Sequence, residues 1–137
     1  MLTTRRDIQI EWGDCDPAGI VFYPRYFAFF DACTAGHFAN AGLPKSEMLK
    51  HYDIVGIPMV DTRAKFIVPS RFGDVVTIET RIKEFRRSSF DVEHRLVKGD
   101  ILAIEAWETR VWVGRHPDDP EAIKAREIPA DVIERFK

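Results

Sequence analysis

One apolar segment, "YPRYFAFFDACTAGHFANAG" at residues 23–42, constrains the fold more than any other part of the chain. Pro24 suits the first position of a helix, where its missing N–H costs nothing, and Gly42 suits the residue that ends one. The residues between them are apolar on nearly every face, which is typical of a buried helix. We therefore expect one long central helix, around which the rest of the chain must fold.

The segments on either side of this helix have the alternating pattern of half-buried strands. Ile8, Ile10 and Trp12 alternate with polar residues before it. A short helix is expected in "KSEMLKHYD", followed by a strand around residues 60–68. Three longer strands then follow, joined by "RRS" and "KGD": "VVTIETRIKEF", "SFDVEHRLV" and "ILAIEAWETRVWVG". "HPDDPEA" is expected to be a loop, and "ADVIERFK" a final helical turn.

This order of elements predicts an α+β fold in a single domain over residues 1–137. The expected architecture is one long helix against an antiparallel sheet of five to six strands. One helix cannot cover both faces of such a sheet. We therefore expect the second face and the sheet edges to be buried by another copy of the chain, in a homo-oligomer.

Composition and charge exclude several classes of function. A net charge of -2 gives no polyanion-binding surface, so nucleic acid is not an expected partner. Cys15 and Cys33 form no disulfide framework, and the four histidines have no metal-ligand spacing. The chain has neither a signal-peptide pattern nor a long apolar run, so we expect a cytoplasmic protein without a membrane partner.

Two acids two residues apart, in "GDCDPAGIVFYP", precede the predicted helix. A helix N-cap is a reasonable role for Asp14, whereas Asp16 lies too far before Pro24 for a simple cap. A calcium loop would need ligands where Ala18 and Arg25 stand. A phosphotransferase with an Asp-x-Asp nucleophile would need a parallel α/β sheet, which the pattern does not predict.

A different role for the acid follows from the helix itself. The start of a buried helix has free N–H groups and a partial positive charge, which polarise a carbonyl oxygen placed there. Since Pro24 has no N–H, Tyr23 is an expected donor. Asp16 could direct its carboxylate at the carbonyl carbon or at a water molecule beside it. This arrangement suits acyl transfer to water.

Three further residues carry charge where charge needs an explanation. Asp31 is the one acid in the helical segment, so we expect it either to meet a partner or line a polar pocket, or to face outward. Arg86 and Arg87 occupy a predicted turn. They are either solvated or suited to binding phosphate groups.

The chain resembles the hot-dog-fold acyl-CoA thioesterases, most closely the 4-hydroxybenzoyl-CoA thioesterase subgroup. The specific match is "GDCDPAGIVFYPRY", and four supporting matches extend over essentially the whole chain: "FFDA", "IVGIPMV", "VTIETRIKEFRRSSF" and "EIPADVIE". The resemblance implies a long helix wrapped by an antiparallel sheet. It also implies dimers joined sheet edge to sheet edge, which pack as tetramers.

The resemblance also implies roles for particular residues. Asp16 matches the catalytic carboxylate, as nucleophile or general base, and Tyr23 the residue whose backbone N–H polarises the thioester. The implied substrate-binding residues are Gly19, Asp31, Ile57, Pro58 and Met59, and the implied CoA-binding residues are Arg86, Arg87 and Ser88. Ile57 stands where close members carry threonine near a ring hydroxyl, so the resemblance leaves the ring substituent open.

The expected activity is hydrolysis of an aromatic acyl-CoA without a metal or redox cofactor, coenzyme A being part of the substrate. Two alternatives remain open. A related subgroup acting on short-chain acyl-CoAs usually carries histidine where Tyr23 stands, so "YP" favours the aromatic subgroup. The other alternative is a non-catalytic module that binds acyl-CoA.

Overall fold

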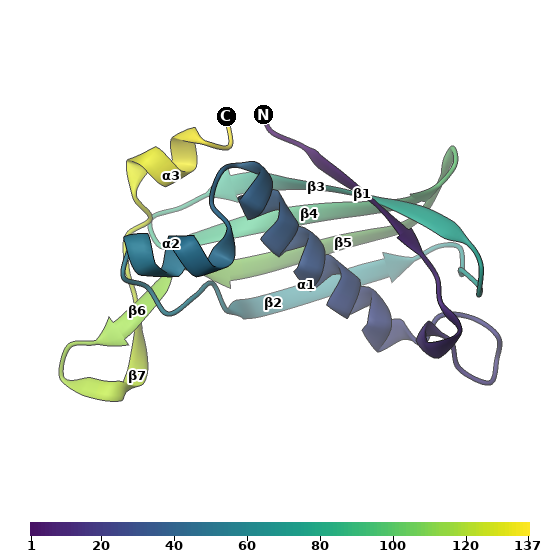
Figure 1. Ribbon diagram of the computed structural model, residues 1–137, viewed down its shortest axis with the longest axis horizontal. Coiled ribbons are helices and arrows are strands. Elements are labelled where there is room, and N and C mark those ends of the chain that lie inside the picture. The colour runs from purple at the N-terminus through teal and green to yellow at the C-terminus, as the bar shows by residue number, and fades with distance from the viewer.

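The computed structural model describes residues 1–137 and places one long helix across one face of a five-stranded antiparallel sheet (Figure 1). The helix is α1 (Tyr23–Asn40), and the sheet has the order β1-β3-β4-β5-β2. Its strands are β1 (Thr4–Gln9), β2 (Met59–Phe66), β3 (Val75–Phe85), β4 (Ser89–Lys98) and β5 (Ile101–Val111). The α+β class and the antiparallel sheet of five to six strands predicted from the sequence are confirmed, with five strands in the sheet.

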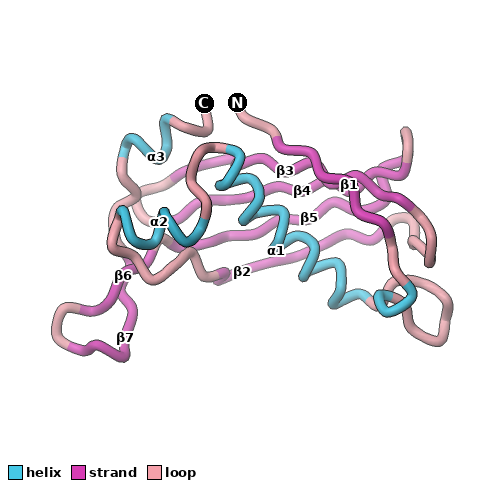
Figure 2. Tube along the Cα trace, viewed as in Figure 1, coloured by secondary structure: helices cyan, strands magenta, loops and turns pink.

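The smaller elements complete the two ends of the sheet (Figure 2). They are the 3-10 helix η1 (Trp12–Asp14), α2 (Lys45–His51), β6 (Val113–His116), β7 (Asp119–Ala125) and α3 (Ala130–Glu134). The helices expected in "KSEMLKHYD" and "ADVIERFK" are present. No helix in the structure is both long and apolar enough to span a lipid bilayer.

Two expectations about local structure are wrong. "HPDDPEA" is not a loop throughout, because β6 and β7 form a hairpin that extends beyond the sheet in Figure 1. Pro120 is tolerated in β7 because a two-stranded ribbon leaves one side of each strand unpaired. Trp12 does not continue β1. The chain leaves the ladder after Gln9, and Trp12 is exposed in η1.

The buried side chains of α1 lie on one face, so the expectation of a helix buried all round is also wrong. The buried residues are Tyr26, Phe30, Cys33, Thr34, His37 and Phe38. Ala28, Ala32 and Ala39 face outward; their small side chains account for the apolar pattern. Full burial of a Phe side chain contributes about 2–3 kcal/mol, so this one face is sufficient to hold α1 on the sheet.

Gly42 ends α1 as the sequence predicts. Its φ of +85° is a conformation that favours glycine. The N–H of Leu43 donates to the carbonyl of Phe38 at 2.9 Å, and the N–H of Gly42 donates to Ala39 at 2.9 Å. These two bonds form a Schellman motif, which satisfies carbonyl groups at the end of the helix.

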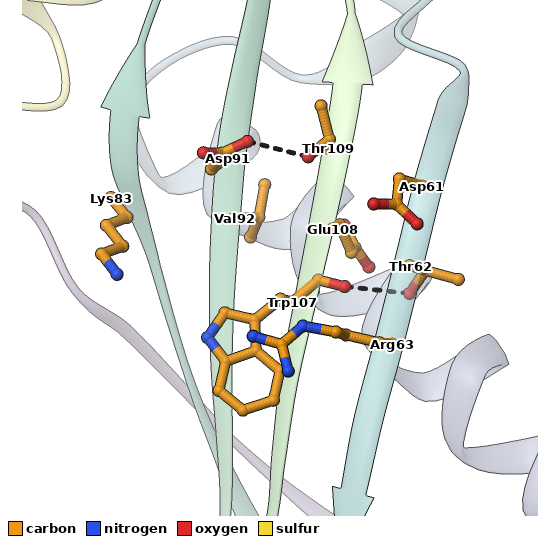
Figure 3. Close-up of a pocket in the computed structure, with 9 residues that line it drawn as sticks. All are labelled: Asp61, Thr62, Arg63, Lys83, Asp91, Val92, Trp107, Glu108 and Thr109. Carbon is orange, nitrogen blue, oxygen red and sulfur yellow. Dashed lines mark hydrogen bonds between the residues drawn. The ribbon is translucent and has the colours of Figure 1, made fainter.

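The sheet face turned away from α1 is charged rather than apolar. One row across the five strands alternates in sign, each residue standing opposite the next: Arg5, Glu79, Arg95, Glu105 and Lys65. On the same face, the guanidinium of Arg63 lies 4.0 Å from the ring centre of Trp107, beside a shallow cavity of about 240 Å³ (Figure 3). Such a face is stable in water, because opposite charges on neighbouring strands attract.

Candidate active site

A tight loop before α1 holds Asp16. Cys15 and Val21 pair as an isolated antiparallel bridge, and the N–H of Asp16 donates to the carbonyl of Ile20 at 3.1 Å. The turn closes when the N–H of Gly19 donates to the carbonyl of Asp16 at 2.9 Å. Gly19 has a φ of +81°, which most residues with a side chain adopt at a cost. Asp16 is therefore fixed a few residues before the helix begins.

Asp14 has a structural role in this loop. It is buried, and its Oδ2 accepts the N–H of Glu11 at 2.9 Å, which closes a capping box around η1. Its Oδ1 accepts Nε of Arg25 at 3.0 Å. Asp14 therefore caps η1 and is tied to the first turn of α1, whereas the N-cap position of α1 itself is occupied by Phe22.

The first turn of α1 leaves a donor free next to this loop. The N–H of Arg25 donates to the carbonyl of Phe22 at 2.8 Å, Pro24 has no N–H, and no backbone carbonyl accepts the N–H of Tyr23. The first turn carries no acid that would neutralise the partial positive charge there. The half-buried Asp16 uses Oδ1 to accept the N–H of Ala18 at 2.9 Å, while its Oδ2 accepts no hydrogen bond from the chain.

A second group of expected site residues meets further along α1, around Arg110 of β5. Nη2 of Arg110 lies 2.8 Å from Oδ1 of Asp31, and Nη1 donates to the carbonyl of Ile57 at 3.1 Å. Asp31 thus meets a partner, and it also faces outward, with 64% of its side chain exposed, so both expected outcomes hold. A cavity of about 30 Å³ adjoins these residues, lined also by Thr34, Ala35, Phe38, Lys45 and Met48. Pro58 and Met59 follow directly at the start of β2.

The third expected group, Arg86, Arg87 and Ser88, forms the turn between β3 and β4. The guanidinium of Arg86 makes two hydrogen bonds to Asp91, at 2.7 and 2.9 Å, and contacts Glu84 at 3.2 Å. These carboxylates raise the pKa of Arg86. The side chain of Arg87 is exposed and makes no hydrogen bond or ion pair within the chain. Arg87 is thus the free cation of this turn.

Comparison with known proteins identifies the family. Residues 10–136 match the thioesterase-like superfamily. The chain belongs to this superfamily. The helix-and-sheet arrangement described above is its hot-dog fold, as the sequence resemblance predicts.

Individual members of the thioesterase-like superfamily are similar over nearly the whole chain. The 4-hydroxybenzoyl-CoA thioesterase of Pseudomonas sp. strain CBS-3 is 42% identical over 132 residues, 92% of each chain. Its solved structure has a TM-score of 0.88 and 40% identity, over 97% of this chain and 98% of that one. The structure of a gentisyl-coenzyme A thioesterase has a TM-score of 0.82 and 33% identity, over 97% and 98%.

Sequence reasoning missed Arg110 and the acid that supports it, Glu108. Both are buried on β5, and Nε of Arg110 lies 2.8 Å from Oε1 of Glu108. Burial opposes ionisation of each, but their contacts outweigh it: hydrogen bonds with His94 and Arg110 lower the pKa of Glu108, and the contacts with Glu108 and Asp31 raise the pKa of Arg110. The sequence of β5 nevertheless contains a signal for these two charges. In "ILAIEAWETRV" both charges occupy the same alternating positions as Ile104 and Ala106, which face α1.

Proposed function

We propose that this thioesterase-like chain hydrolyses the thioester of an aromatic acyl-CoA, giving the free acid and coenzyme A. The observation that carries the proposal is at the start of α1, where the Asp16 carboxylate and the unpaired N–H of Tyr23 belong to one short segment. The proposed chemistry uses no metal or redox cofactor.

In the proposed mechanism, the thioester oxygen accepts the N–H of Tyr23 at the positive end of α1. Charge that develops on this oxygen in the transition state is stabilised there. Asp16 then acts in one of two ways. It attacks the carbonyl carbon, so that the C–S bond breaks, coenzyme A leaves as the thiolate, and water hydrolyses the mixed anhydride that remains. Alternatively, it takes a proton from the water that attacks the carbonyl carbon, and the C–S bond then breaks with the same leaving group.

The proposed acyl site lies beside Asp31, Ile57, Pro58 and Met59, with Gly19 shaping the loop at the thioester. Two of the similar proteins described above are named for aromatic acyl groups, a 4-hydroxybenzoyl and a gentisyl group, which supports an aromatic substrate. A further solved structure is an aspartate-to-asparagine variant of a 4-hydroxybenzoyl-CoA thioesterase in complex with 4-hydroxybenzoyl-CoA. A carboxylate needed for turnover but not for binding, as proposed for Asp16, is compatible with such a complex.

We propose that the turn of Arg86, Arg87 and Ser88 holds the nucleotide end of coenzyme A. Phosphate groups suit arginine because the planar guanidinium offers paired donors. Arg87 is the residue whose guanidinium is free to do this. Arg86 is occupied by Asp91, so its proposed contribution is to fix the shape of the turn and add positive charge.

A homodimer that assembles into a homotetramer in the cytoplasm is the proposed state of the protein. The edge strand β2 supports this, because it has an unpaired outer edge and carries Val60 with 63% of its surface exposed. Phe66, near the other end of the same strand, is also exposed and packs against Tyr26 and Phe27 of α1.

The experiment that tests the proposal is a thiol-release screen with benzoyl-CoA, 4-hydroxybenzoyl-CoA and butyryl-CoA. The proposal predicts the highest kcat/KM on an aromatic substrate. A preference for butyryl-CoA would contradict the proposed aromatic substrate and indicate a short-chain acyl-CoA thioesterase. Binding of acyl-CoA without any thiol release would replace it with a non-catalytic module.

A further inference from the structure

The chain between β2 and β3 contacts the loop that carries Asp16. The carbonyl of Ser70 accepts the N–H of Val21 at 2.9 Å. Nη1 of Arg71 donates to the carbonyl of Gly19 at 3.4 Å. Val21 and Gly19 flank the residue whose carbonyl accepts the N–H of Asp16, so this part of the loop is held from outside on both sides.

The same segment also contacts the chain ahead of Asp16. The rings of Phe72 and of Trp12 in η1 pack edge to face, with their centres 5.7 Å apart. Figure 1 shows the β2–β3 connection and the Asp16 loop at the same end of the sheet. Residues 69–74, which we call the bracket turn, therefore contact the chain both before and after Asp16. A shift of the bracket turn would move the Asp16 carboxylate relative to the start of α1.

Lys98, the last residue of β4, ties the two ends of the bracket turn together. Its Nζ donates to the carbonyl of Pro69 at 3.0 Å and lies 3.1 Å from Oδ2 of Asp74. The same carboxylate oxygen accepts the N–H of Arg71 at 2.9 Å. This N–H and the ammonium of Lys98 together lower the pKa of Asp74. Because the side chains of Lys98 and Asp74 are both half-buried, salt screens their attraction less than that of a fully exposed pair.

We infer that Lys98 is a positioning residue for the proposed hydrolysis, which acts through the bracket turn to fix the carboxylate of Asp16 relative to the N–H of Tyr23. The inference rests on the proposed function. Asp16 and Tyr23 act on one carbonyl group, so their relative position decides the rate. A displacement of about 1 Å can lower the rate of such a reaction by about 100-fold. Lys98 itself does not touch the substrate, so its loss should leave binding intact.

The kinetic test compares the wild type with Lys98→Met, Asp74→Asn and the double variant. Methionine keeps most of the side-chain length without the ammonium, and asparagine keeps an acceptor for the N–H of Arg71 without the charge. On the best aromatic acyl-CoA, each single variant should lower kcat by at least about tenfold with KM little changed, because the positioning matters in the transition state. The double variant should lose little more than either single variant, since both break one contact.

Hydrogen exchange of the Val21 amide gives a second readout that does not depend on turnover. Its hydrogen bond to Ser70 should open more often once the bracket turn is released. We expect its exchange in Lys98→Met to be about threefold faster, the scale set by loss of a partly exposed ion pair. The amide of Leu43, at the other end of α1, should exchange as in the wild type. Equal acceleration of both amides would indicate a general loss of stability and overturn the inference.

The matched control is Arg81→Met, which removes an ion pair with Glu93 (3.0 Å) on the outer face of the sheet, away from the bracket turn. It should leave both kcat and the exchange of Val21 unchanged. An active wild type with unchanged kcat in Lys98→Met overturns the inference and leaves the thioesterase proposal in place. A fall of kcat without faster exchange of Val21 also overturns it, since the loss would not pass through the loop. No hydrolysis of any acyl-CoA by the wild type overturns both.

Discussion

Asp14 and Arg25 form an ion pair in which Nε and Nη2 of the guanidinium each lie 3.0 Å from the same carboxylate oxygen. The pair connects η1 to the first turn of α1, so it fixes both ends of the loop that carries Asp16. Asp14 thereby organises the segment, while Asp16, two residues further on, keeps one carboxylate oxygen free for chemistry.

Replacing Asp14 by alanine should lower the free energy of unfolding by about 1–3 kcal/mol, because the hydrogen bonds that its buried carboxylate accepts from Glu11 and Arg25 are lost. Arg25→Ala should cost less, since the half-exposed guanidinium also contacts water. Urea unfolding of both variants checks this order. Equal stability of wild type and Asp14→Ala would show that the loop does not depend on this carboxylate.

The buried His37 should make stability depend on pH. Burial lowers the pKa of His37 from 6.5 to about 4, so the folded state binds the proton more weakly than the unfolded state does. The contribution is therefore fully present above about pH 6.5 and is lost as the pH falls towards 4. At about 1.4 kcal/mol per pKa unit it is on the order of 3 kcal/mol.

His37→Gln tests this contribution, with His51→Gln on exposed α2 as the control. The free energy of unfolding, measured from pH 7 to pH 4, should fall less steeply in His37→Gln than in the control. Identical slopes would mean that another group causes the acid sensitivity.

The two arginines of the β3–β4 turn should behave differently. Arg87→Ala should raise KM for acyl-CoA by about tenfold with kcat unchanged, because a contact to the nucleotide is made equally in the ground and transition states. Arg86→Ala should instead disturb the shape of the β3–β4 turn, because the ion pair with Asp91 is lost. Steady-state kinetics on an acyl-CoA and on a pantetheine thioester lacking the nucleotide separates the cases. An Arg87→Ala defect that persists on the truncated substrate would contradict the assignment.

The edge of β2 should control assembly. Val60→Asp places a charge on this edge and should shift the protein towards monomer in sedimentation velocity, because burying an unpaired carboxylate in an interface is costly. Ile101→Asp is the control, at a similarly exposed position (56%) in the first residue of β5. A Val60→Asp protein that sediments like the wild type would place the interface elsewhere.

Local patterns predicted the long elements well, because each is determined by its own sequence. β3 has the predicted limits, and Gly42 ends α1 through the backbone conformation that glycine allows. The charge on the outer sheet face escaped prediction although it follows from the same alternation. Alternation predicts which apolar residues of each strand are buried, but it does not by itself predict that the charged residues between them form a stable face of their own.

The polar network of Asp31, Arg110, Glu108 and His94 could not be predicted from the sequence, for a different reason. The sequence marks Asp31 as a charge that needs an explanation, but Arg110 is 79 residues away in sequence. Only the sheet register brings Glu108 opposite Val92 and places His94 nearby. Long-range pairing of this kind is set by tertiary packing, which no local pattern specifies. The loop of Asp16, by contrast, is formed by contacts within a few residues and was therefore recognisable.

The Asp16→Asn substitution tests the central claim most directly, because asparagine keeps the size and removes the charge. Asp100→Asn, in the exposed β4–β5 turn, serves as the control. Single-turnover and steady-state thiol release should show that kcat on the best aromatic acyl-CoA falls by at least about 100-fold in Asp16→Asn, while substrate binding is little changed. An Asp16→Asn protein that keeps most of its wild-type kcat would contradict the account.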